Sequence, residues 1–479
     1  MLAIAHRQRE DLVNKKVACG LVLMLSTTVA SYGQAFKVLL DFDGTNGADP
    51  FYMSLVQGLD GSFYGTASAG GPHHNGTVFK VTAAGALTTL YDLCPQVSCI
   101  HGSGLDSGVV LAADGNFYGF ANNGGLYNFG AVYRITSSGQ WTTLHSFNGS
   151  DGAGQYYSAL IQGTDGKLYG VTTGGGTYGY GTAFSITLSG TLTTLYNFCS
   201  QPDCADGGSP VGGLVQGADG SFYGATLAGG ANGYGTLFKI TRGGTLTTLY
   251  NFCSQPNCAD GYYPHAALVR GGDGNFYGTT GGGTAGTMFR MAPDGTFTTL
   301  LTFCCDDGGS PVSGLIEGTD GSFYGTTASP AGSSMYGALY RITRDGRLTI
   351  LHSFDGTDGS TPYGGLVQGT DGSFYGTTTY GGPASGTLGY GTVYRLSVGL
   401  APFVTSLPNN GAVGETIKIL GTDLIGATAV NFNGVPAAFT VVSPTEVATT
   451  VPTDATTGYL TVATPTGTLK TNVPFQVLP

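Results

Sequence analysis

The chain has 479 residues, a formal net charge of −11 and only 10% charged residues. This acidic balance argues against nucleic acid and anionic membranes as partners, because both attract basic surfaces. The 84 glycines recur at regular places beside Tyr, Phe and Thr, so they indicate the turns of an all-β protein rather than disorder.

Residues 1–35 predict a secretory signal peptide. Lys15 and Lys16 precede an apolar stretch at 17–30, and small residues allow cleavage near Ala30 or Ala35. The stretch is too short to span a membrane comfortably. We therefore expect export to a secreted or cell-surface location, with no transmembrane segment and no C-terminal membrane anchor. Without its four basic and two acidic residues, the charge becomes −13 (−11 − 4 + 2).

One phrase, Asp-Gly-x-Phe/Leu-Tyr-Gly, recurs along the next part of the chain. It begins at Asp60, Asp114, Asp165, Asp219, Asp273, Asp320 and Asp371. The steps range from 47 residues (273 to 320) to 54 residues (60 to 114), and such a period indicates stacked supersecondary units. Each unit holds four strand-like runs, which in the fourth unit are 213–216, 221–226, 235–241 and 245–250. Four antiparallel strands per unit predict the blades of a β-propeller.

The two ends of the repeat array predict that the ring closes. The opening run 36–42 matches a fourth strand, whereas the last unit stops at its third strand, 390–396. The opening strand can therefore complete the last blade and leave no sheet edge exposed. We predict a seven-bladed propeller over residues 36–399, with an open solenoid as the alternative.

The repeated residues have plain structural explanations. Asp-Gly suits a tight hairpin turn between the first and second strands, although seven aspartates on one rim could also bind calcium. The repeated tyrosines are expected in the blade cores; they are Tyr64, Tyr118, Tyr169, Tyr223, Tyr277, Tyr324 and Tyr375.

Eight cysteines remain once Cys19 is removed with the signal peptide. Six of them form pairs separated by four residues, namely Cys94/Cys99, Cys199/Cys204 and Cys253/Cys258, and the last two, Cys304 and Cys305, are adjacent. In an exported chain this spacing predicts local disulfides, each contributing roughly 2 kcal/mol. Zinc would need four convergent ligands, and only His101 lies near a pair. Whether Cys304 and Cys305 bond to each other stays open.

Propeller topology gathers the longest loops on one face. The loops between second and third strands share this variable-loop face with the connections between blades, and binding sites often lie on such loops. The position before the glycine that opens the third strand is aromatic in most units, and aromatic rings can stack on sugars or pack against a neighbouring blade. The candidate ligand-binding residues are Phe129, Tyr178, Tyr180, Tyr234, Tyr336 and Tyr390.

Blade-to-blade loops also carry a polar residue before glycine at equivalent positions. Turn formation explains this pattern, and cation binding is the alternative; the residues are Asn46, His101, Asp151, Asp206, Asp260, Asp307 and Asp358. His145 and His352 replace a tyrosine of other blades, so we expect them to be structural.

The end of the first strand carries Gln in several units, but Arg270 and Glu317 stand there in consecutive units. We predict that these two residues pair across the inner channel, because opposite charges at neighbouring sites satisfy each other. The catalytic candidates are Glu317, His73 and His74. A glycoside hydrolase would need a second carboxylate, and no nucleophile elbow, phosphate loop or dinucleotide fingerprint occurs. We expect no metal and no cofactor.

The composition shifts at Leu400-Ala401-Pro402. The runs Gly414-Glu-Thr-Ile-Lys-Ile-Leu-Gly421 and Ala429-Val-Asn-Phe-Asn-Gly434 resemble an IPT/TIG domain. The resemblance implies an immunoglobulin-like β-sandwich over residues 400–479, which acts as a spacer or adhesion element in secreted bacterial proteins. Upstream, the units Gly-Leu-Val-Gln-Gly-x-Asp-Gly-x-Phe-Tyr-Gly-Thr-Thr resemble the GloVer (Gloeo/Verruco) tandem repeat of exported bacterial proteins. That resemblance brings no catalytic residues.

Three functions remain open on the sequence alone. The first is an exported, non-enzymatic binding or adhesion protein that recognises a polysaccharide or a cell-surface protein through the variable-loop face. The second is a polysaccharide lyase or hydrolase, and the third is a structural protein of the cell envelope.

Overall fold

A computed structural model describes residues 34–94, 99–154, 158–282, 285–304, 309–328, 336–382 and 389–478. The predicted signal segment lies almost entirely outside these residues. The described part is all-β, with two short 3-10 turns, η1 (Pro202–Cys204) and η2 (Pro256–Cys258). It contains no helix that is long and apolar enough to cross a membrane.

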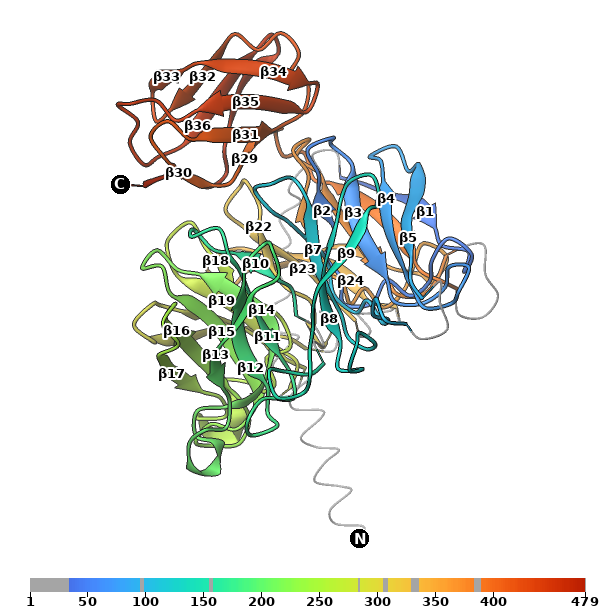
Figure 1. Cartoon of the computed structure of the whole chain (residues 1–479), viewed down its shortest axis with the longest axis vertical. Coiled ribbons are helices and arrows are strands. Elements are labelled where there is room, and N and C mark those ends of the chain that lie inside the picture. Colours follow the sequence, from blue (N-terminus) through green and yellow to red (C-terminus); the bar gives the residue numbers. More distant parts are fainter. Residues whose placement is uncertain are drawn as a thin grey trace, which may run out of the picture.

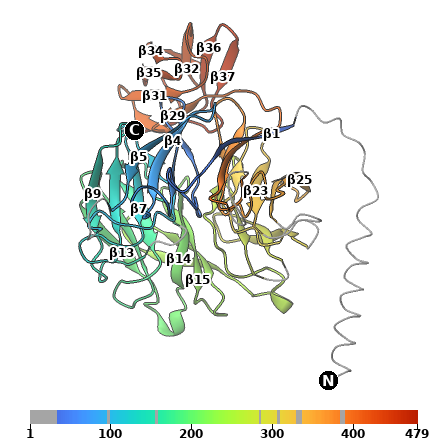
Figure 2. The same cartoon turned by 90° about the vertical axis from the view of Figure 1, so that its right-hand side faces the viewer.

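Seven four-stranded antiparallel sheets of the described residues form a ring (Figures 1 and 2). The first three blades are β2 (Val56–Gln57), β3 (Phe63–Ala67), β4 (Thr77–Val81) and β5 (Leu87–Asp92); β6 (Val110–Leu111), β7 (Phe117–Ala121), β8 (Ala131–Ile135) and β9 (Trp141–Ser146); and β10 (Ile161–Gln162), β11 (Leu168–Thr172), β12 (Thr182–Ile186) and β13 (Leu192–Asn197).

The next three blades continue this order. They are β14 (Gly208–Gln216), β15 (Phe222–Ala228), β16 (Thr236–Ile240) and β17 (Leu246–Asn251); β18 (Val269–Arg270), β19 (Phe276–Thr280), β20 (Thr287–Met291) and β21 (Phe297–Thr302); and β22 (Ile316–Glu317), β23 (Phe323–Thr327), β24 (Ala338–Ile342) and β25 (Leu348–Ser353).

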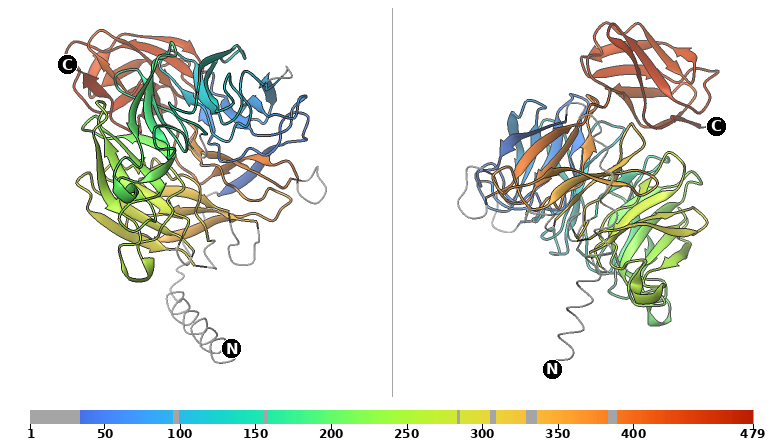
Figure 3. Two further views of the ribbon diagram at one scale, coloured as in Figure 1. Left: turned by 60° about the horizontal axis from the view of Figure 1, so that its bottom comes forward. Right: turned by 180° about the vertical axis from the view of Figure 1, so that it is seen from behind.

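The seventh blade closes the ring with strands from both ends of the array. Its order is β26 (Val367–Gln368), β27 (Phe374–Thr378), β28 (Thr392–Ser397) and β1 (Ala35–Asp41). The β1 strand pairs antiparallel with β28, from Ala35 opposite Ser397 to Asp41 opposite Thr392, and Figure 3 shows the ring from below. The predicted closure is confirmed, and the solenoid alternative is wrong.

Each Asp of the repeated phrase fixes its own hairpin. Asp371 accepts a bond from the Ser373 N–H at 3.0 Å and from the Tyr375 hydroxyl at 2.9 Å. The tyrosine bond recurs in all seven units, at 2.7 to 3.2 Å. Four units add a third-strand cation, as Arg395 does for Asp371 at 2.9 Å. These bonds explain the aspartates without calcium.

The repeated Phe-Tyr pair holds neighbouring blades together. All seven tyrosines are at most 2% exposed, as predicted. In six of the blade junctions the tyrosine ring packs on the phenylalanine ring of the next blade, with centroids 3.9 to 4.2 Å apart. At the remaining junction Leu168 packs beside Tyr118. These buried rings therefore form a belt that runs from blade to blade. Each ring contributes buried apolar area as well as contact with another ring.

A small β-sandwich follows the ring. One sheet contains β29 (Thr405–Leu407), β31 (Thr416–Leu420), β35 (Glu446–Thr450) and β34 (Phe439–Ser443), and the other contains β33 (Val435–Ala437), β32 (Ala429–Phe432), β36 (Leu460–Thr464) and β37 (Gly467–Lys470). A parallel pair, β30 (Asn410–Ala412) and β38 (Gln476–Leu478), completes it. Its core includes Val404, Ile419 and Phe475.

The C-terminal domain rests on the Asp-Gly-turn face of the propeller (Figure 1). The Thr445 hydroxyl donates to the Leu59 carbonyl at 2.7 Å, and the hydroxyls of Thr370 and Thr422 are 2.8 Å apart. The variable-loop face therefore lies at the other end of the blades.

Candidate functional site

The large exposed hydrophobic side chains of the described propeller gather on the variable-loop face. All of them belong to loops between second and third strands or between blades; they are Ile100, Leu126, Tyr127, Phe129, Tyr178, Tyr180, Tyr234, Tyr263, Tyr336 and Tyr390. The six predicted ligand-binding residues are all in this set, and their side chains are 38 to 50% exposed. Exposed apolar surface collected on one face is typical of an interaction site.

Most of these rings are also held by the next loop. A Cβ atom added to Gly149 would lie 3.2 Å from the Phe129 ring, and Gly44 stands in the same relation to Tyr390 at 3.1 Å. Tyr234 instead lies 5.3 Å from the Tyr262 ring. The aromatic positions thus pack against their surroundings and still present ring surface to solvent.

The variable-loop face is acidic. Its loops, from 43–55 to 379–391, contain no Lys or Arg in the sequence, whereas Asp43, Asp203 and Asp355 are exposed there. The propeller's Lys and Arg residues instead lie toward the Asp-Gly-turn end, where Lys239 pairs with Asp219 at 2.6 Å.

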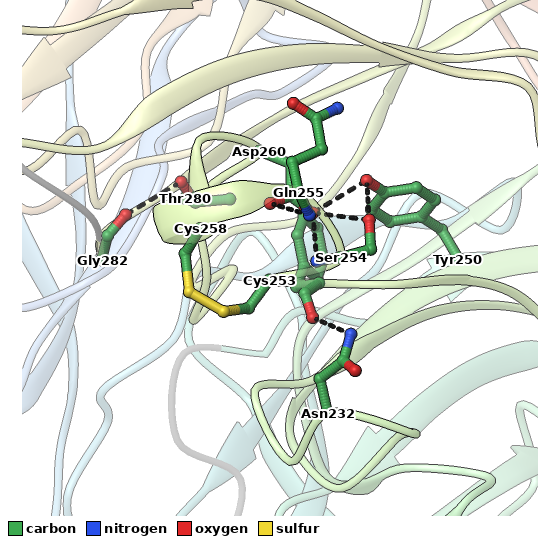
Figure 4. The surroundings of a disulfide bond; sticks show 10 residues. Asn232, Tyr250, Cys253, Ser254, Gln255, Cys258, Asp260, Thr280 and Gly282 are labelled. Carbon is green, nitrogen blue, oxygen red and sulfur yellow. Dashed lines mark hydrogen bonds between the residues drawn. A yellow bond between two sulfur atoms is a disulfide. The ribbon is translucent and has the colours of Figure 1, made fainter.

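The loop aspartates before glycine order their own loops. Asp260 is fully buried beside the Cys253–Cys258 disulfide and accepts bonds from Tyr250, Ser254 and Gln255 (Figure 4). Asp206 repeats the arrangement beside Cys199–Cys204. Burial alone would raise the pKa of Asp206, but hydrogen bonds from Tyr196, Ser200 and Gln201 lower it below the ordinary value.

The two histidines at the tyrosine position of the repeat contact the equivalent loop aspartates of their own blades, which lack a cysteine pair. His145 lies 2.8 Å from Asp151, and His352 lies 2.7 Å from Asp358. These bonds support the structural role expected of both histidines. Asp307 lies outside the described residues, and the described ones hold no group of three or more potential metal ligands.

The predicted disulfides form at Cys94–Cys99, Cys199–Cys204 and Cys253–Cys258. They exclude the zinc alternative for these cysteines, because a disulfide sulfur is no longer a thiolate ligand. Cys305 lies outside the described residues.

The three catalytic candidates are not brought together. His73 and His74 are exposed in a loop of the variable-loop face, where His73 pairs with Asp92. Glu317 lies at the Asp-Gly-turn end of β22.

The predicted pair of Arg270 and Glu317 is wrong. Glu317 pairs with Arg344 of its own blade and accepts a bond from the Gly272 N–H at 2.7 Å. Among the described residues Arg270 has no ion pair. The physical reason is that side chains at the ends of the first strands reach the adjacent hairpin turn of the preceding blade rather than the side chain next to them.

This reach defines a clip between blades. The Gln216 side-chain oxygen accepts from the Thr164 N–H of the preceding blade at 3.0 Å, while its amide donates to the Gly220 carbonyl of its own turn. Gln57, Gln162 and Gln368 make the same two bonds, and Glu317 makes the first. The recurrence of Gln at this position was the sequence signal for the clip.

A cavity of about 700 Å³ runs along the inner strands and ends against the C-terminal domain. The propeller contributes residues such as Gln162, Gln216 and Arg270, and the C-terminal domain contributes residues such as Tyr459 and Asn472. Arg270 is the charged side chain in this lining.

Comparison with known proteins assigns a family model to each of the two parts of the chain. The model of the Gloeobacter/Verrucomicrobia repeat matches residues 93–285 and 255–418, and that of the IPT/TIG domain matches residues 402–477. No curated protein matches the chain significantly.

Similar solved structures share little sequence with the chain. They include a fungal alcohol oxidase of the AA5 family in complex with copper (12% identity, 93% of this chain and 99% of that chain, TM-score 0.49). Others are a gluconolactonase from Xanthomonas campestris (13%, 56% and 78%, 0.36) and an auxiliary nutrient binding protein from Bacteroides thetaiotaomicron (13%, 76% and 77%, 0.40). These likenesses carry no inference about activity. On the family matches, the chain belongs to the Gloeobacter/Verrucomicrobia repeat family and carries an IPT/TIG domain.

Proposed function

We propose that this chain is an exported, non-enzymatic binding protein whose variable-loop face recognises a glycan. The observation that carries the proposal is the concentration of exposed aromatic rings on that face, including Tyr180, Tyr234 and Tyr390. An aromatic ring covers the apolar C–H surface of a sugar while its edge leaves the sugar hydroxyls free to bond.

The packing of these rings supports binding. Phe129 and Tyr390 lie against glycines of the following loop, so less side-chain freedom is lost when a ligand stacks on them. Such preorganisation raises affinity by lowering the entropic cost of binding.

The charge of the face favours neutral or amine-bearing glycans over acidic ones. The loops carry aspartates such as Asp43 and Asp355 and no Lys or Arg, and like charge disfavours association. Export is supported by the three disulfides, which persist in oxidising compartments. The IPT/TIG domain rests on the opposite face and serves as the spacer.

Binding without turnover is supported by the state of the catalytic candidates. Glu317 is paired with Arg344 at the far end of the blade from the aromatic loops, and His73 is paired with Asp92. A hydrolase needs an acid and a second carboxylate around one sugar bond.

The test is retention of the purified chain on insoluble chitin, chitosan and cellulose. Tyr180→Ala and Tyr234→Ala, singly and together, should weaken retention by about tenfold or more, since an aromatic contact contributes about 1 kcal/mol beyond its buried area. The control is Ile425→Ala, which changes a 60% exposed side chain of the IPT/TIG domain.

Equal retention of the double variant and the parent would overturn the assignment to this face. New reducing ends or unsaturated sugars released from the polymers, and lost in Glu317→Gln, would replace binding with a lyase or hydrolase activity.

A further inference from the structure

Two of the seven blade junctions lack the side-chain oxygen that caps the preceding turn. In blade two the position holds Leu111, and in blade five it holds Arg270. Neither side chain can accept a hydrogen bond. The N–H of Ala218, which corresponds to the capped Thr164 N–H one blade earlier, therefore has no hydrogen-bond partner among the described residues.

The turn that carries this uncapped N–H lines the central cavity. Ala218, Gly217 and Arg270 all line the cavity of about 700 Å³, beside Asn472 and Tyr459 of the IPT/TIG domain. Arg270 occupies the repeat position from which Gln216 reaches the Thr164 turn one blade earlier. The position that carries an acceptor oxygen in every intact clip therefore carries a guanidinium here, in the wall of the same cavity as the Ala218 turn.

The surroundings leave the positive charge uncompensated. No Asp or Glu is among the described residues lining the cavity. The nearby Glu317 is already held by Arg344 and the Gly272 N–H. Arg270 is solvent-exposed at the wall of the cavity and has no acidic partner among the described residues. Such a cation attracts an anion, and a planar carboxylate matches the fork of a guanidinium.

We infer that the cavity between the propeller and the IPT/TIG domain binds a small carboxylate-bearing ligand through Arg270 and the Ala218 N–H. One carboxylate oxygen takes the place of the missing glutamine oxygen, and the guanidinium pairs with the carboxylate. The cavity volume suits a ligand of one or two sugar rings, and the amides of Gln162 and Asn472 supply partners for its hydroxyls.

The experiment is calorimetric titration of the full chain with sodium glucuronate, glucuronamide and N-acetylglycylglycine. The affinity for glucuronate should be at least about ten times that for glucuronamide, because the amide removes the charge but keeps the shape. Tighter binding of glucuronate than of the peptide assigns the site to acidic sugars, and the reverse assigns it to chain-terminal carboxylates. Equal affinity for glucuronate and glucuronamide would overturn the inference.

Two variants copy residues that the repeat itself uses at this position. Arg270→Gln should weaken glucuronate binding by about tenfold or more and raise the melting temperature, because the new amide oxygen caps the Ala218 N–H. Arg270→Leu should weaken binding to the same extent without that gain. The control is Arg347→Gln, in an exposed turn away from the cavity, which should bind as the parent does.

Unchanged glucuronate binding in Arg270→Gln would overturn the inference. The result is independent of the proposed glycan face: Tyr180→Ala should leave glucuronate binding unchanged, and Arg270→Gln should leave retention on chitin unchanged.

Discussion

The aspartate of the repeated phrase shows how one side chain can serve a whole unit. One oxygen closes the Asp-Gly turn, and the other accepts the hydroxyl of the tyrosine four residues later, as in Asp219 and Tyr223. The spacing of the phrase follows from this geometry, because the tyrosine body lies in the core while its hydroxyl reaches back to the turn.

Acid should destabilise the protein through these carboxylates. Burial opposes ionisation of Asp60, Asp206 and Asp219, but their hydrogen-bond partners, including Lys80 and Lys239, hold each pKa below 3.8. A depressed carboxyl pKa stabilises the fold above the unfolded value, and this contribution is lost as pH falls through the folded value. We expect a nearly constant unfolding free energy at mildly acidic pH and a steep fall below pH 3.8.

Urea denaturation across this range measures the effect. Asp206→Asn should be less stable at neutral pH and should show a shallower acid dependence. A parent protein that becomes more stable below pH 3.8 would contradict this account, because the raised pKa values of the partly buried Asp49 and Asp106 would then dominate.

The blade is the element that the clip acts on. Apart from β14, the first strands of the described blades pair over only two residues, such as Ile161 and Gln162 with Tyr169 and Leu168. The inner edge of such a blade therefore needs support from its neighbour. The clip supplies this support before the Asp-Gly turn, through hydrogen bonds. The belt of aromatic rings supplies it after the turn, through apolar contact.

Replacing Gln216 by Leu should lower the unfolding free energy by about 1–2 kcal/mol, because two hydrogen bonds of ordinary strength are lost. Leucine already occupies this place as Leu111, so the shape is tolerated. The reciprocal variant Leu111→Gln should gain stability by capping the Leu59 N–H. Urea denaturation of both variants gives the comparison, and opposite signs are required; equal losses would show that shape rather than the clip matters.

The repeat made the blade architecture predictable, but not the contacts made by its exceptions. Strand runs, Asp-Gly turns and the count of fourth strands all follow local rules, so the closed ring, the buried tyrosines and the disulfides could be read from sequence. The partner of Glu317 could not be read from the sequence. Like the clip glutamines, Glu317 reaches the hairpin turn of the preceding blade and not the side chain at the equivalent position of that blade. The docking of the IPT/TIG domain rests on hydroxyls such as Thr422 and Thr445, which no sequence pattern distinguishes.

At the scale of the whole molecule, charge and architecture share one axis. The IPT/TIG domain and the basic residues of the propeller lie at the Asp-Gly-turn end, and the aromatic, acidic loops lie at the other. A glycan-bearing surface would therefore meet only the acidic end of the protein, while the central cavity stays beneath the second domain.

Ring closure should govern solution behaviour. Deleting residues 34–41 exposes the β28 edge and removes the Phe36 ring, which stacks on His352 at 3.7 Å. We expect a lower melting temperature and concentration-dependent self-association, since open strand edges pair with other chains. Phe36→Ala, the control, keeps the backbone pairing and should melt earlier while staying dispersed. Light scattering with thermal melts measures both, and a deletion variant that stays monomeric would contradict the role of β1.

The closing strand also constrains the order in which the ring can fold during synthesis. Residues 35–41 are synthesised first, yet their partners at 392–397 come after the entire repeat array. Each newly synthesised third strand emerges before its own fourth strand. Its open edge can therefore pair with β1 until the fourth strand of the same blade displaces β1. Joining ends so far apart is slow and leaves unpaired strands exposed. A stalled or truncated chain that lacks residues 392–397 would therefore keep β1 without its native partner.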